Sequence, residues 1–305
     1  MAAPTSHPDR YAVIGNPIAQ SKSPTIHGMF AQAAQQHMVY TKIESPLGGF
    51  AATVDAFRAE EIDGVSHGPA CENHGPACEN HGPACGLNIT APFKLDAFAY
   101  ATHHSERAQL VGAANALKFE RTAQGVNVMA DNFDGIGLVR DVLHNLACAL
   151  AGKRVLIIGA GGATRGALLP LLAEKPAHLV VANRTVATAR ELAALVSAHG
   201  RVQAAAYPEL NGQVFDVVFN ATSASLRAEL PPLPASVFAP GCLAYDLTYG
   251  KGLTPFLVFA RSAGVVHLAD GVGMLVEQAA EAFAWWRGVR PATRAVIDHI
   301  TVPLV

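Results

Sequence analysis

A short apolar strand that runs directly into glycines and then into a helix constrains the fold of this chain more than any other feature. Residues 154–158, RVLII, are followed at once by GAGGATRG at 159–166. Glycine lets the backbone turn tightly and approach a pyrophosphate, whose charge then lies on the N–H groups at the start of the helix. The order predicts a dinucleotide-binding turn with modified G-x-G-x-x-G spacing, in which Gly166 allows close helix packing; a purely structural turn is the alternative. The cofactor-binding residues expected here are Gly159, Ala160, Gly161, Gly162 and Ala163.

The end of the next predicted strand indicates the type of dinucleotide. LVVANR at 179–184 ends in Asn183 and Arg184, and Thr185 follows. An NAD-binding chain usually has an acidic residue here for the ribose 2′-hydroxyl, whereas an arginine fork and a hydroxyl suit a 2′-phosphate. We therefore expect NADP rather than NAD, bound by these three residues. The alternative is a solvated arginine at the start of a helix.

The remaining pattern alternates between strands and helices, which is typical of α/β proteins with mostly parallel sheets. With 305 residues, 50% of them apolar, the chain can bury two cores, so we expect two domains. In the first half the predicted strands are 11–15, 38–43, 86–90, 114–119 and 125–130, and the predicted helices are 24–37, 50–58, one opening at Pro92, and 134–150. In the second half, strands at 179–184, 215–221, 243–247 and 265–268 follow the first one, and a helix covers 273–288.

Composition excludes several classes of partner. Charged residues are 15% of the chain and the net charge is −2, which gives no electrostatic footprint for nucleic acid or an anionic membrane. The N-terminus lacks an apolar core, and no window reaches the roughly 18 apolar residues of a membrane span. We expect a cytoplasmic protein with a small-molecule substrate, as a monomer or homodimer, whose five cysteines are reduced.

A tandem repeat interrupts the pattern. HGPACEN occupies 67–73 and 74–80, and HGPAC closes the array at 81–85. Three cysteines and three histidines could in principle bind zinc. Gly-Pro in each unit disfavours regular structure, so we expect a mobile surface insertion and no metal site; a duplication within the sequence would look the same.

Several separated segments, in order along nearly the whole chain, resemble the shikimate dehydrogenase family. Any one of them could arise by chance, but the series could not. The segments are GNPIAQSKSP at 15–24, GLNITAPFK at 86–94, GAANAL at 112–117, DNFDGIGL at 131–138, the glycine turn, NRT at 183–185, NATSA at 220–224, YDLTYGKGLTPFL at 245–257 and DGVGMLVEQAA at 270–280.

The resemblance implies a domain organisation and a reaction. Residues 1–134 with 270–305 would form the substrate domain, residues 135–269 a Rossmann-like NADP domain, and the active site would lie between them, with the C-terminal helix returning to the substrate domain. The reaction would be the reversible NADPH-dependent reduction of 3-dehydroshikimate to shikimate, on the route to chorismate and the aromatic amino acids.

The resemblance also assigns roles to individual residues. Ser21 and Ser23 would hold the shikimate carboxylate, and Lys94 would lie at the reacting hydroxyl. Gln278 would reach the ring hydroxyls, and Tyr249 would close the pocket. The residues expected beside Lys94 are Asn88, Thr90, Asn115 and Asp134; those bordering the cofactor toward the nicotinamide are Ala221, Thr222 and Met274.

The chemistry of ketone reduction gives a separate reason for the proposed catalytic pair. A ketone that accepts hydride develops negative charge on oxygen and needs a proton donor or cation beside it. Lys94 supplies both, and the Asp134 carboxylate can orient its ammonium and share its proton. Without the motif around it, Lys94 would be read as a solvated helix residue. Asp131 is a rival carboxylate, which we interpret as a structural neighbour.

Three positions depart from the family pattern: Phe133 and Ser225 replace a threonine and a glycine, and Thr188 replaces a second phosphate-binding arginine. The nearest substitute is Arg190. The alternatives are an NAD-preferring quinate/shikimate dehydrogenase, another reductase on the same two-domain frame, and a non-catalytic NADP-binding sensor; the last is disfavoured by the intact Lys94 and Asp134.

Overall fold

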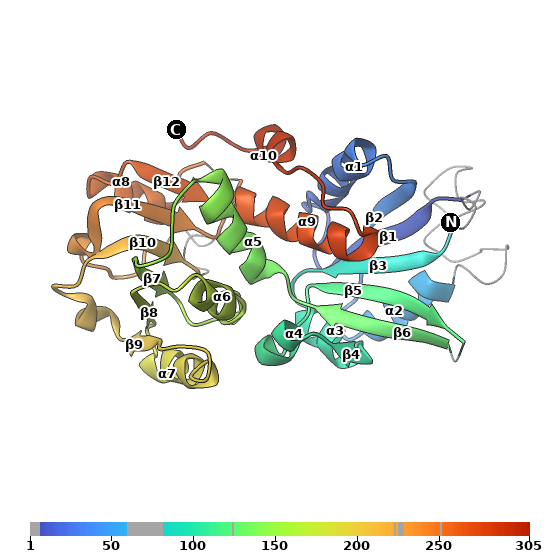
Figure 1. Ribbon diagram of the computed structural model, residues 1–305, viewed down its shortest axis with the longest axis horizontal. Helices are drawn as coiled ribbons and strands as arrows, with labels where there is room; N and C mark the ends of the chain where they lie inside the picture. The colour runs from blue at the N-terminus through green and yellow to red at the C-terminus, as the bar shows by residue number, and fades with distance from the viewer. Residues whose placement is uncertain (1–6, 60–81, 124, 223, 225–228, 251) are drawn as a thin grey trace. The chain divides into compact units, whose positions relative to one another are not determined.

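The computed structural model describes residues 7–59, 82–123, 125–222, 224, 229–250 and 252–305 (Figure 1). It divides into two compact units, Met1–Asn132 with Ala279–Ala292, and Phe133–Gln278 with Thr293–Val305. Each unit contains one six-stranded sheet. The α/β class and the two-part organisation expected from the sequence are therefore present.

The first unit has a mixed sheet in the order β2-β1-β3-β5-β6-β4. The pairs β1–β2, β1–β3 and β4–β6 are parallel, while β3–β5 and β5–β6 are antiparallel. The chain turns from β5 to β6 within a few residues, too few for the crossover that a parallel pair needs. The strands are β1 (Asp9–Gly15), β2 (Met38–Glu44), β3 (Ala84–Ile89), β4 (His103–His104), β5 (Ala116–Thr122) and β6 (Gly125–Asp131). The helices are α1 (Ser23–Ala33), α2 (Phe50–Ala59), α3 (Lys94–Tyr100) and α4 (Glu106–Val111).

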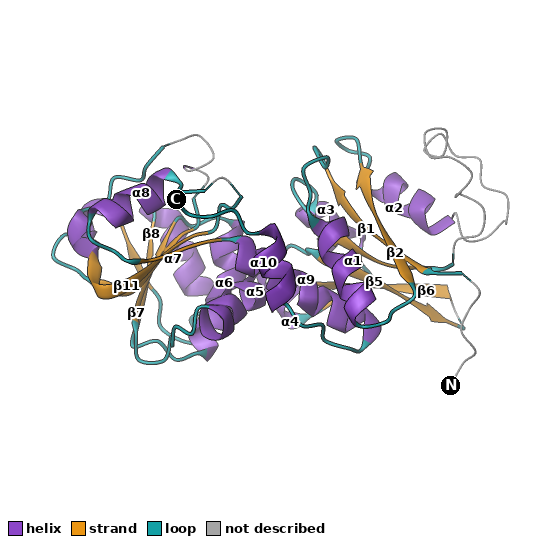
Figure 2. Cartoon of the chain, turned by 90° about the horizontal axis from the view of Figure 1, so that it is seen from above, coloured by secondary structure: helices purple, strands orange, loops and turns teal. Residues whose placement is uncertain are grey.

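Alternate residues of the central strands face two different cores. Ala12 and Ile14 of β1 pack with Phe50 of α2 and Phe93. On the other face Tyr11 contacts Trp286, with ring centroids 4.8 Å apart. Figure 2 shows α1 and α2 on opposite sides of the strands. The period of two along each strand thus produces both layers.

An aromatic cluster fills the second of these cores: His27, Phe30, Tyr40, Phe283 and Trp286. The His27 ring is fully buried and stacks on Tyr40, with centroids 4.2 Å apart. Burial lowers the pKa of His27 to about 3 from 6.5, because the charged ring would lose its hydration. The imidazole is therefore neutral at physiological pH and acts as a flat core ring.

The second unit has the Rossmann strand order β9-β8-β7-β10-β11-β12, all parallel. The strands are β7 (Arg154–Ile158), β8 (His178–Ala182), β9 (Gln203–Ala205), β10 (Phe215–Asn220), β11 (Phe238–Asp246) and β12 (His267–Asp270). The helices are α5 (Asp134–Arg140), the π-helical turn η2 (Asp141–Asn145), α6 (Gly162–Ala173), α7 (Val186–Leu195), the 3-10 turns η3 (Tyr207–Leu210) and η5 (Ala235–Val237), α8 (Pro255–Ser262), the first part of α9 (Val272–Arg287) and α10 (Arg294–Ile300). The predicted dinucleotide-binding fold is confirmed.

Close helix packing explains one glycine pair of this unit. A Cβ atom on Gly135 of α5 would collide with the carbonyl oxygen of Gly166 in α6. The two helices therefore approach backbone to backbone at this point. Gly166 lies at this close approach through its backbone, while the glycine that the approach requires is Gly135.

Two sequence-based boundaries differ in the structure. The helix predicted over 134–150 ends at Asn145, because Ala147 has a left-handed φ of 50° that a helix does not tolerate. The C-terminal part predicted to belong to the substrate domain is divided: Ala279–Ala292 lies in the first unit, whereas Val272–Gln278 and α10 lie in the second. A continuous helix, α9, supplies residues to both cores.

The repeat lies mostly outside the described residues. Its expected surface position and mobility at 67–81 therefore stay predictions. Ala84 and Cys85, at the end of the third copy, form the start of β3, two residues earlier than the sequence predicted. The array thus runs directly into the strand that carries Asn88.

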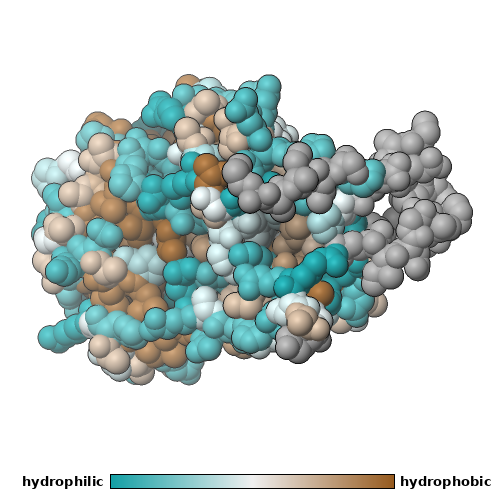
Figure 3. Space-filling view, turned by 45° about the vertical axis from the view of Figure 1, so that its right-hand side comes forward, coloured by the Kyte–Doolittle hydropathy of each residue, from teal (hydrophilic) through white to brown (hydrophobic). Residues whose placement is uncertain are grey.

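No helix among the described residues is both long and apolar enough to cross a bilayer. Figure 3 shows one face of the molecule, on which apolar side chains form patches interrupted by polar ones.

Replacing His27 with phenylalanine should make the first unit less sensitive to acid. In wild type the unfolded chain binds a proton at His27 below pH 6.5, whereas the folded chain binds it only near pH 3, so stability falls as the pH drops through this interval. Between pH 7 and pH 5 we expect wild type to lose about 1–2 kcal/mol more than His27→Phe.

Urea unfolding followed by tryptophan fluorescence checks this prediction, because the chain's two tryptophans, Trp285 and Trp286, both lie in the first unit. Equal losses of stability in the two proteins would contradict a neutral, buried His27.

Candidate active site

Strand direction gathers the predicted substrate-binding residues of the first unit at one sheet edge. The parallel strands β1 and β3 both end there, and antiparallel β5 begins there, with Asn88 opposite Ala116. Ala116 in turn lies opposite Asp131, the last residue of β6. Asn88, Thr90 and Asn115 consequently lie at this edge. Asp134 comes three residues after Asp131 in the sequence, as the first residue of α5.

The Asn88 side chain is held on both sides. The Tyr40 hydroxyl donates to Asn88 Oδ1 at 2.7 Å, and Asn88 Nδ2 donates to the carbonyl oxygen of Asn115 at 3.3 Å. Asn88 is 5% exposed and Asn115 is 2% exposed. The two hydrogen bonds of Asn88 offset the cost of burying its amide and fix the orientation of that amide.

Lys94 is positioned through its backbone and its neighbour. It opens α3, and its carbonyl oxygen accepts a hydrogen bond from Ala114 N at 2.9 Å, just before Asn115. Phe93 is buried in the core, and its N–H donates to the carbonyl oxygen of Thr90 at 3.1 Å. These two hydrogen bonds fix the backbone position from which the half-buried Lys94 side chain starts.

Asp131 is held by hydrogen bonds to structural partners, which distinguishes it from Asp134. Its carboxylate accepts from Ser105 Oγ at 2.5 Å, from the backbone N–H of Asn132 at 2.7 Å and from Arg107 Nη2 at 2.5 Å. Both oxygens are thus occupied by structural partners. Asp134 is half-buried at the start of α5 in the second unit.

Ser21 and Ser23 form a hydroxyl pair where α1 begins. Ser21 Oγ donates to Ser23 Oγ at 3.2 Å and accepts from Ser23 N at 3.3 Å. Pro24, within the first turn of α1, fixes the chain direction there. A carboxylate bound here could accept from both hydroxyls if the proton of Ser21 turned from Ser23 to the ligand.

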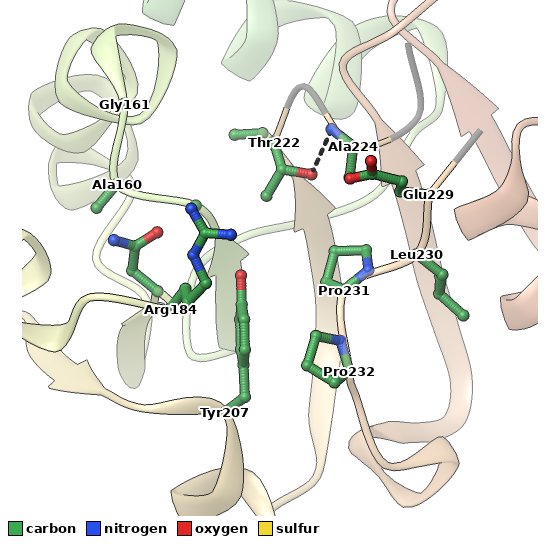
Figure 4. A pocket seen from close by; sticks show the side chains of 13 residues that line it. Ala160, Gly161, Arg184, Tyr207, Thr222, Ala224, Glu229, Leu230, Pro231 and Pro232 are labelled. Carbon is green, nitrogen blue, oxygen red and sulfur yellow. Dashed lines mark hydrogen bonds between the residues drawn. The ribbon is translucent and has the colours of Figure 1, made fainter. Parts of the chain in front are cut away.

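The second unit has a pocket of about 350 Å³ beyond the carboxyl ends of β7, β8 and β10 (Figure 4). This is the switch point of a Rossmann sheet, where dinucleotides bind. Its lining residues are Gly159, Ala160, Gly161, Asn183, Arg184, Tyr207, Ala221, Thr222, Ala224, Glu229, Leu230, Pro231 and Pro232.

The glycine turn has the geometry that a pyrophosphate needs. Gly159 has a φ of 100°, and a Cβ there would lie 3.0 Å from Thr222 Cγ2, so glycine is required. Cβ atoms on Gly161 and Gly162 would meet nothing within 4 Å. No side chain caps the start of α6, which leaves its first N–H groups to a ligand.

A buried carboxylate holds the segment after β10, which lies against Gly159 of the glycine turn. Asp246 is fully buried and accepts from Asn220 Nδ2 at 3.2 Å and from Thr254 Oγ1 at 2.6 Å. Asn220 Oδ1 accepts from Thr222 Oγ1 at 2.7 Å. The position of Thr222 is therefore determined by a chain of hydrogen bonds across β10, β11 and the start of α8.

Not every predicted cofactor residue lines this pocket. Gly162, Ala163, Thr185 and Met274 are not among its described lining residues. Thr185 nevertheless fixes a neighbour, because its carbonyl oxygen accepts from Asn183 Nδ2 at 2.9 Å.

Met274 is anchored elsewhere in the second unit. Its N–H donates to the Tyr245 hydroxyl at 3.3 Å, and that hydroxyl donates to Asp141 Oδ2 at 2.7 Å. Gln278 Nε2 donates to the carbonyl oxygen of Leu275 at 2.9 Å. Tyr249 is 40% exposed in the connection between β11 and α8.

Sequence reasoning missed Tyr207 and residues 229–232. Tyr207 follows β9, a strand of three residues that is too short to show a periodic pattern. Residues 229–232 have no element of their own. Recognition of β9 as the third Rossmann strand would have placed Tyr207 beside Arg184.

Three family profiles match the chain: "Shikimate / quinate 5-dehydrogenase" at residues 141–228, "Shikimate dehydrogenase substrate binding domain" at 13–67 and 77–117, and "Shikimate 5'-dehydrogenase C-terminal domain" at 271–300. Together they cover more than half of the sequence. The chain belongs to the shikimate dehydrogenase family. The resemblance predicted from the motifs is confirmed.

Relatives match over nearly their whole length. "Shikimate dehydrogenase (NADP(+))" of Nitrosospira multiformis is 50% identical over 96% of this chain and 97% of that protein, and its namesake in Chromobacterium violaceum is 49% identical over the same shares. Among solved structures, an Ael1 enzyme from Pseudomonas putida is 56% identical, with a TM-score of 0.85 over 97% of this chain and 100% of that one. Shikimate 5-dehydrogenase from Thermus thermophilus, in complex with NADP(H) and shikimate, is 26% identical, with a TM-score of 0.74 over 95% and 97%.

Removing the Tyr40 hydroxyl should weaken substrate binding in this member of the shikimate dehydrogenase family. Tyr40→Phe leaves Asn88 Oδ1 without its donor, a loss on the order of 1 kcal/mol, so we expect the KM for shikimate to rise about three- to tenfold. The KM for NADP⁺ should stay unchanged.

Steady-state kinetics in the oxidation direction measure both constants. The matched control is Tyr100→Phe, whose hydroxyl donates to Asp55 Oδ1 at 2.6 Å and has no bond to Asn88. An equal rise of the KM for shikimate in both variants would contradict the role of Tyr40.

Proposed function

We propose that this chain is an NADP-dependent shikimate dehydrogenase that catalyses the reversible reduction of 3-dehydroshikimate to shikimate. The observation that carries the proposal is the position of Lys94 at a sheet edge where the buried amide of Asn88 is fixed by hydrogen bonds, one of them to the backbone of buried Asn115. Full-length similarity to proteins named "Shikimate dehydrogenase (NADP(+))" supports it. So does the arginine at the adenosine end of the Rossmann pocket.

The proposed proton chemistry uses Lys94 and Asp134. NADPH, when bound, supplies the hydride that reduces the ring ketone. The Lys94 ammonium donates a proton to the oxygen on which negative charge develops. The Asp134 carboxylate orients that ammonium, and in the oxidation direction neutral Lys94 accepts the hydroxyl proton.

Substrate recognition is assigned to polar side chains of both units. The hydroxyls of Ser21 and Ser23, which lie within hydrogen-bond distance of each other, would hold the carboxylate of shikimate. The ring hydroxyls would form hydrogen bonds with the remaining predicted substrate-binding residues, and Tyr249 would close the pocket. These remaining residues are Asn88, Thr90, Asn115 and Gln278.

The cofactor is assigned to the pocket of the second unit. The pyrophosphate would lie on the start of α6, next to residues 159–163, and the 2′-phosphate beside Arg184. Asn183 and Thr185 would support the adenosine end, and Ala221, Thr222 and Met274 would border the nicotinamide. We further propose that the protein acts in the cytoplasm as a monomer or homodimer.

The Lys94→Ala variant should lose roughly 10²- to 10⁴-fold in kcat for 3-dehydroshikimate, because general acid catalysis contributes about this much. Asp134→Asn should lose activity in the same direction. NADPH binding, followed by nicotinamide fluorescence, should be unchanged in both variants, since neither residue lines the dinucleotide pocket.

Two control variants separate catalysis from structure. Lys118→Ala removes a lysine that pairs with Glu120 at 2.9 Å and should keep full activity. Asp131→Asn removes the charge that forms the ion pair with Arg107. This variant should have a lower Tm, while the kcat of the folded enzyme should stay unchanged. Undiminished turnover by Lys94→Ala with NADPH bound would overturn the catalytic assignment.

Quinate is a second candidate substrate, because one matching profile is described as "Shikimate / quinate 5-dehydrogenase". Oxidation of shikimate and of quinate, each with NADP⁺ and with NAD⁺, distinguishes the two functions. We expect the highest kcat/KM with shikimate and NADP⁺.

A further inference from the structure

Strand pairing places Tyr207 beside the adenosine end of the dinucleotide pocket. Ala205 of β9 pairs with Ala182 of β8, and Asn183 N donates to the carbonyl oxygen of Ala205 at 3.1 Å. The two residues that follow β9 therefore run alongside Asn183 and Arg184. Tyr207 is the first residue of η3 and lines the same pocket as both.

The backbone that carries Tyr207 is fixed. Ala206 N donates to the Glu209 carboxylate at 2.6 Å, and Glu209 N donates to the carbonyl oxygen of Ala206 at 3.0 Å. Leu210, at the end of the same turn, is fully buried in the core of the second unit. The ring thus projects from a short turn anchored at both ends.

The Tyr207 hydroxyl lies on the cationic wall of the pocket. Figure 4 shows it close to the Arg184 side chain, while Glu229, Pro231 and Pro232 lie across the pocket. Burial raises the pKa of Tyr207, whereas the Arg184 charge and its backbone N–H act in the opposite direction. The hydroxyl therefore stays protonated at neutral pH and can act as a hydrogen-bond donor.

A 2′-phosphate needs more donors than one arginine supplies. It has three acceptor oxygens, and a guanidinium fork satisfies two of them. Thr188 stands where the family resemblance led us to expect a second arginine. Arg190 is exposed on α7, and neither residue is among the described residues that line the pocket.

We propose that the Tyr207 hydroxyl donates a hydrogen bond to the 2′-phosphate of NADP and, with Arg184, sets the preference for NADP over NAD. The proposal rests on the cofactor site proposed above. It assigns the second phosphate contact to a neutral donor rather than to Arg190.

Binding of adenosine 2′,5′-bisphosphate and of 5′-AMP, measured by titration calorimetry on the full chain, tests the proposal without turnover. In Tyr207→Phe we expect the Kd of the bisphosphate to rise about tenfold, as for a lost hydrogen bond to a charged group, and that of 5′-AMP to stay within about twofold. The KM for NADP⁺ should rise in parallel, with the KM for NAD⁺ unchanged. Arg190→Ala is the matched comparison and should bind both probes as wild type does.

Three results would overturn the proposal. Unchanged bisphosphate binding in Tyr207→Phe would remove the hydroxyl from the site. Equal weakening of both probes would indicate a contact to the adenosine rather than to the phosphate. Loss confined to Arg190→Ala would return the role to the arginine.

A different experimental result would refute the proposed function. Wild type that binds the bisphosphate normally but does not reduce 3-dehydroshikimate would refute the assigned reaction and leave the role of Tyr207 intact.

Discussion

Parallel strand pairing in register is the constraint on which the rest of this structure depends. In the second unit one row of paired residues crosses the sheet at its carboxyl edge, and every connection that follows starts from that row. The row is Ala205, Ala182, Ile158, Asn220, Asp246 and Asp270. Residues that are far apart in sequence, such as Gly159, Arg184 and Thr222, line one pocket because the strands that precede them end together. The first unit uses the same device, with antiparallel β5 and β6 adding Asn115 and Asp131 to the edge formed by β1 and β3.

Buried polar groups then hold these edges in one arrangement. An amide such as Asn88 or a carboxylate such as Asp246 is costly to bury unless its hydrogen bonds are made, and in both cases partners from neighbouring elements make them. The same principle separates two aspartates that the sequence places three residues apart. Asp131 uses both oxygens to tie β6 to Ser105 and Arg107, whereas Asp134, to which we assign the proton chemistry in our proposal, lies at the start of α5.

The sequence predicted those parts of the molecule whose signal is local. The glycine turn and the longer apolar strands are contiguous, so their physical reasons can be read from adjacent residues. Partners separated along the chain could not be found in this way: Tyr40 is 48 residues from Asn88, and only the folded sheet places its hydroxyl on the amide. Short elements could not be predicted for a related reason, because a strand of three residues such as β9 is too short to show a periodic pattern. The helix predicted over 134–150 was too long because apolar spacing continues past Asn145, while the left-handed backbone at Ala147 ends the helix.

Exposure decides how strongly each donor at the adenosine end can discriminate between cofactors. Arg184 is exposed, so with NAD its guanidinium would remain hydrated, and the missing phosphate would leave little unpaired. Tyr207 is half-buried. A donor that water reaches poorly loses more when its ligand lacks the matching acceptor. On the assignment proposed above, the half-buried tyrosine therefore adds to the discrimination between the two dinucleotides that the exposed arginine alone would give.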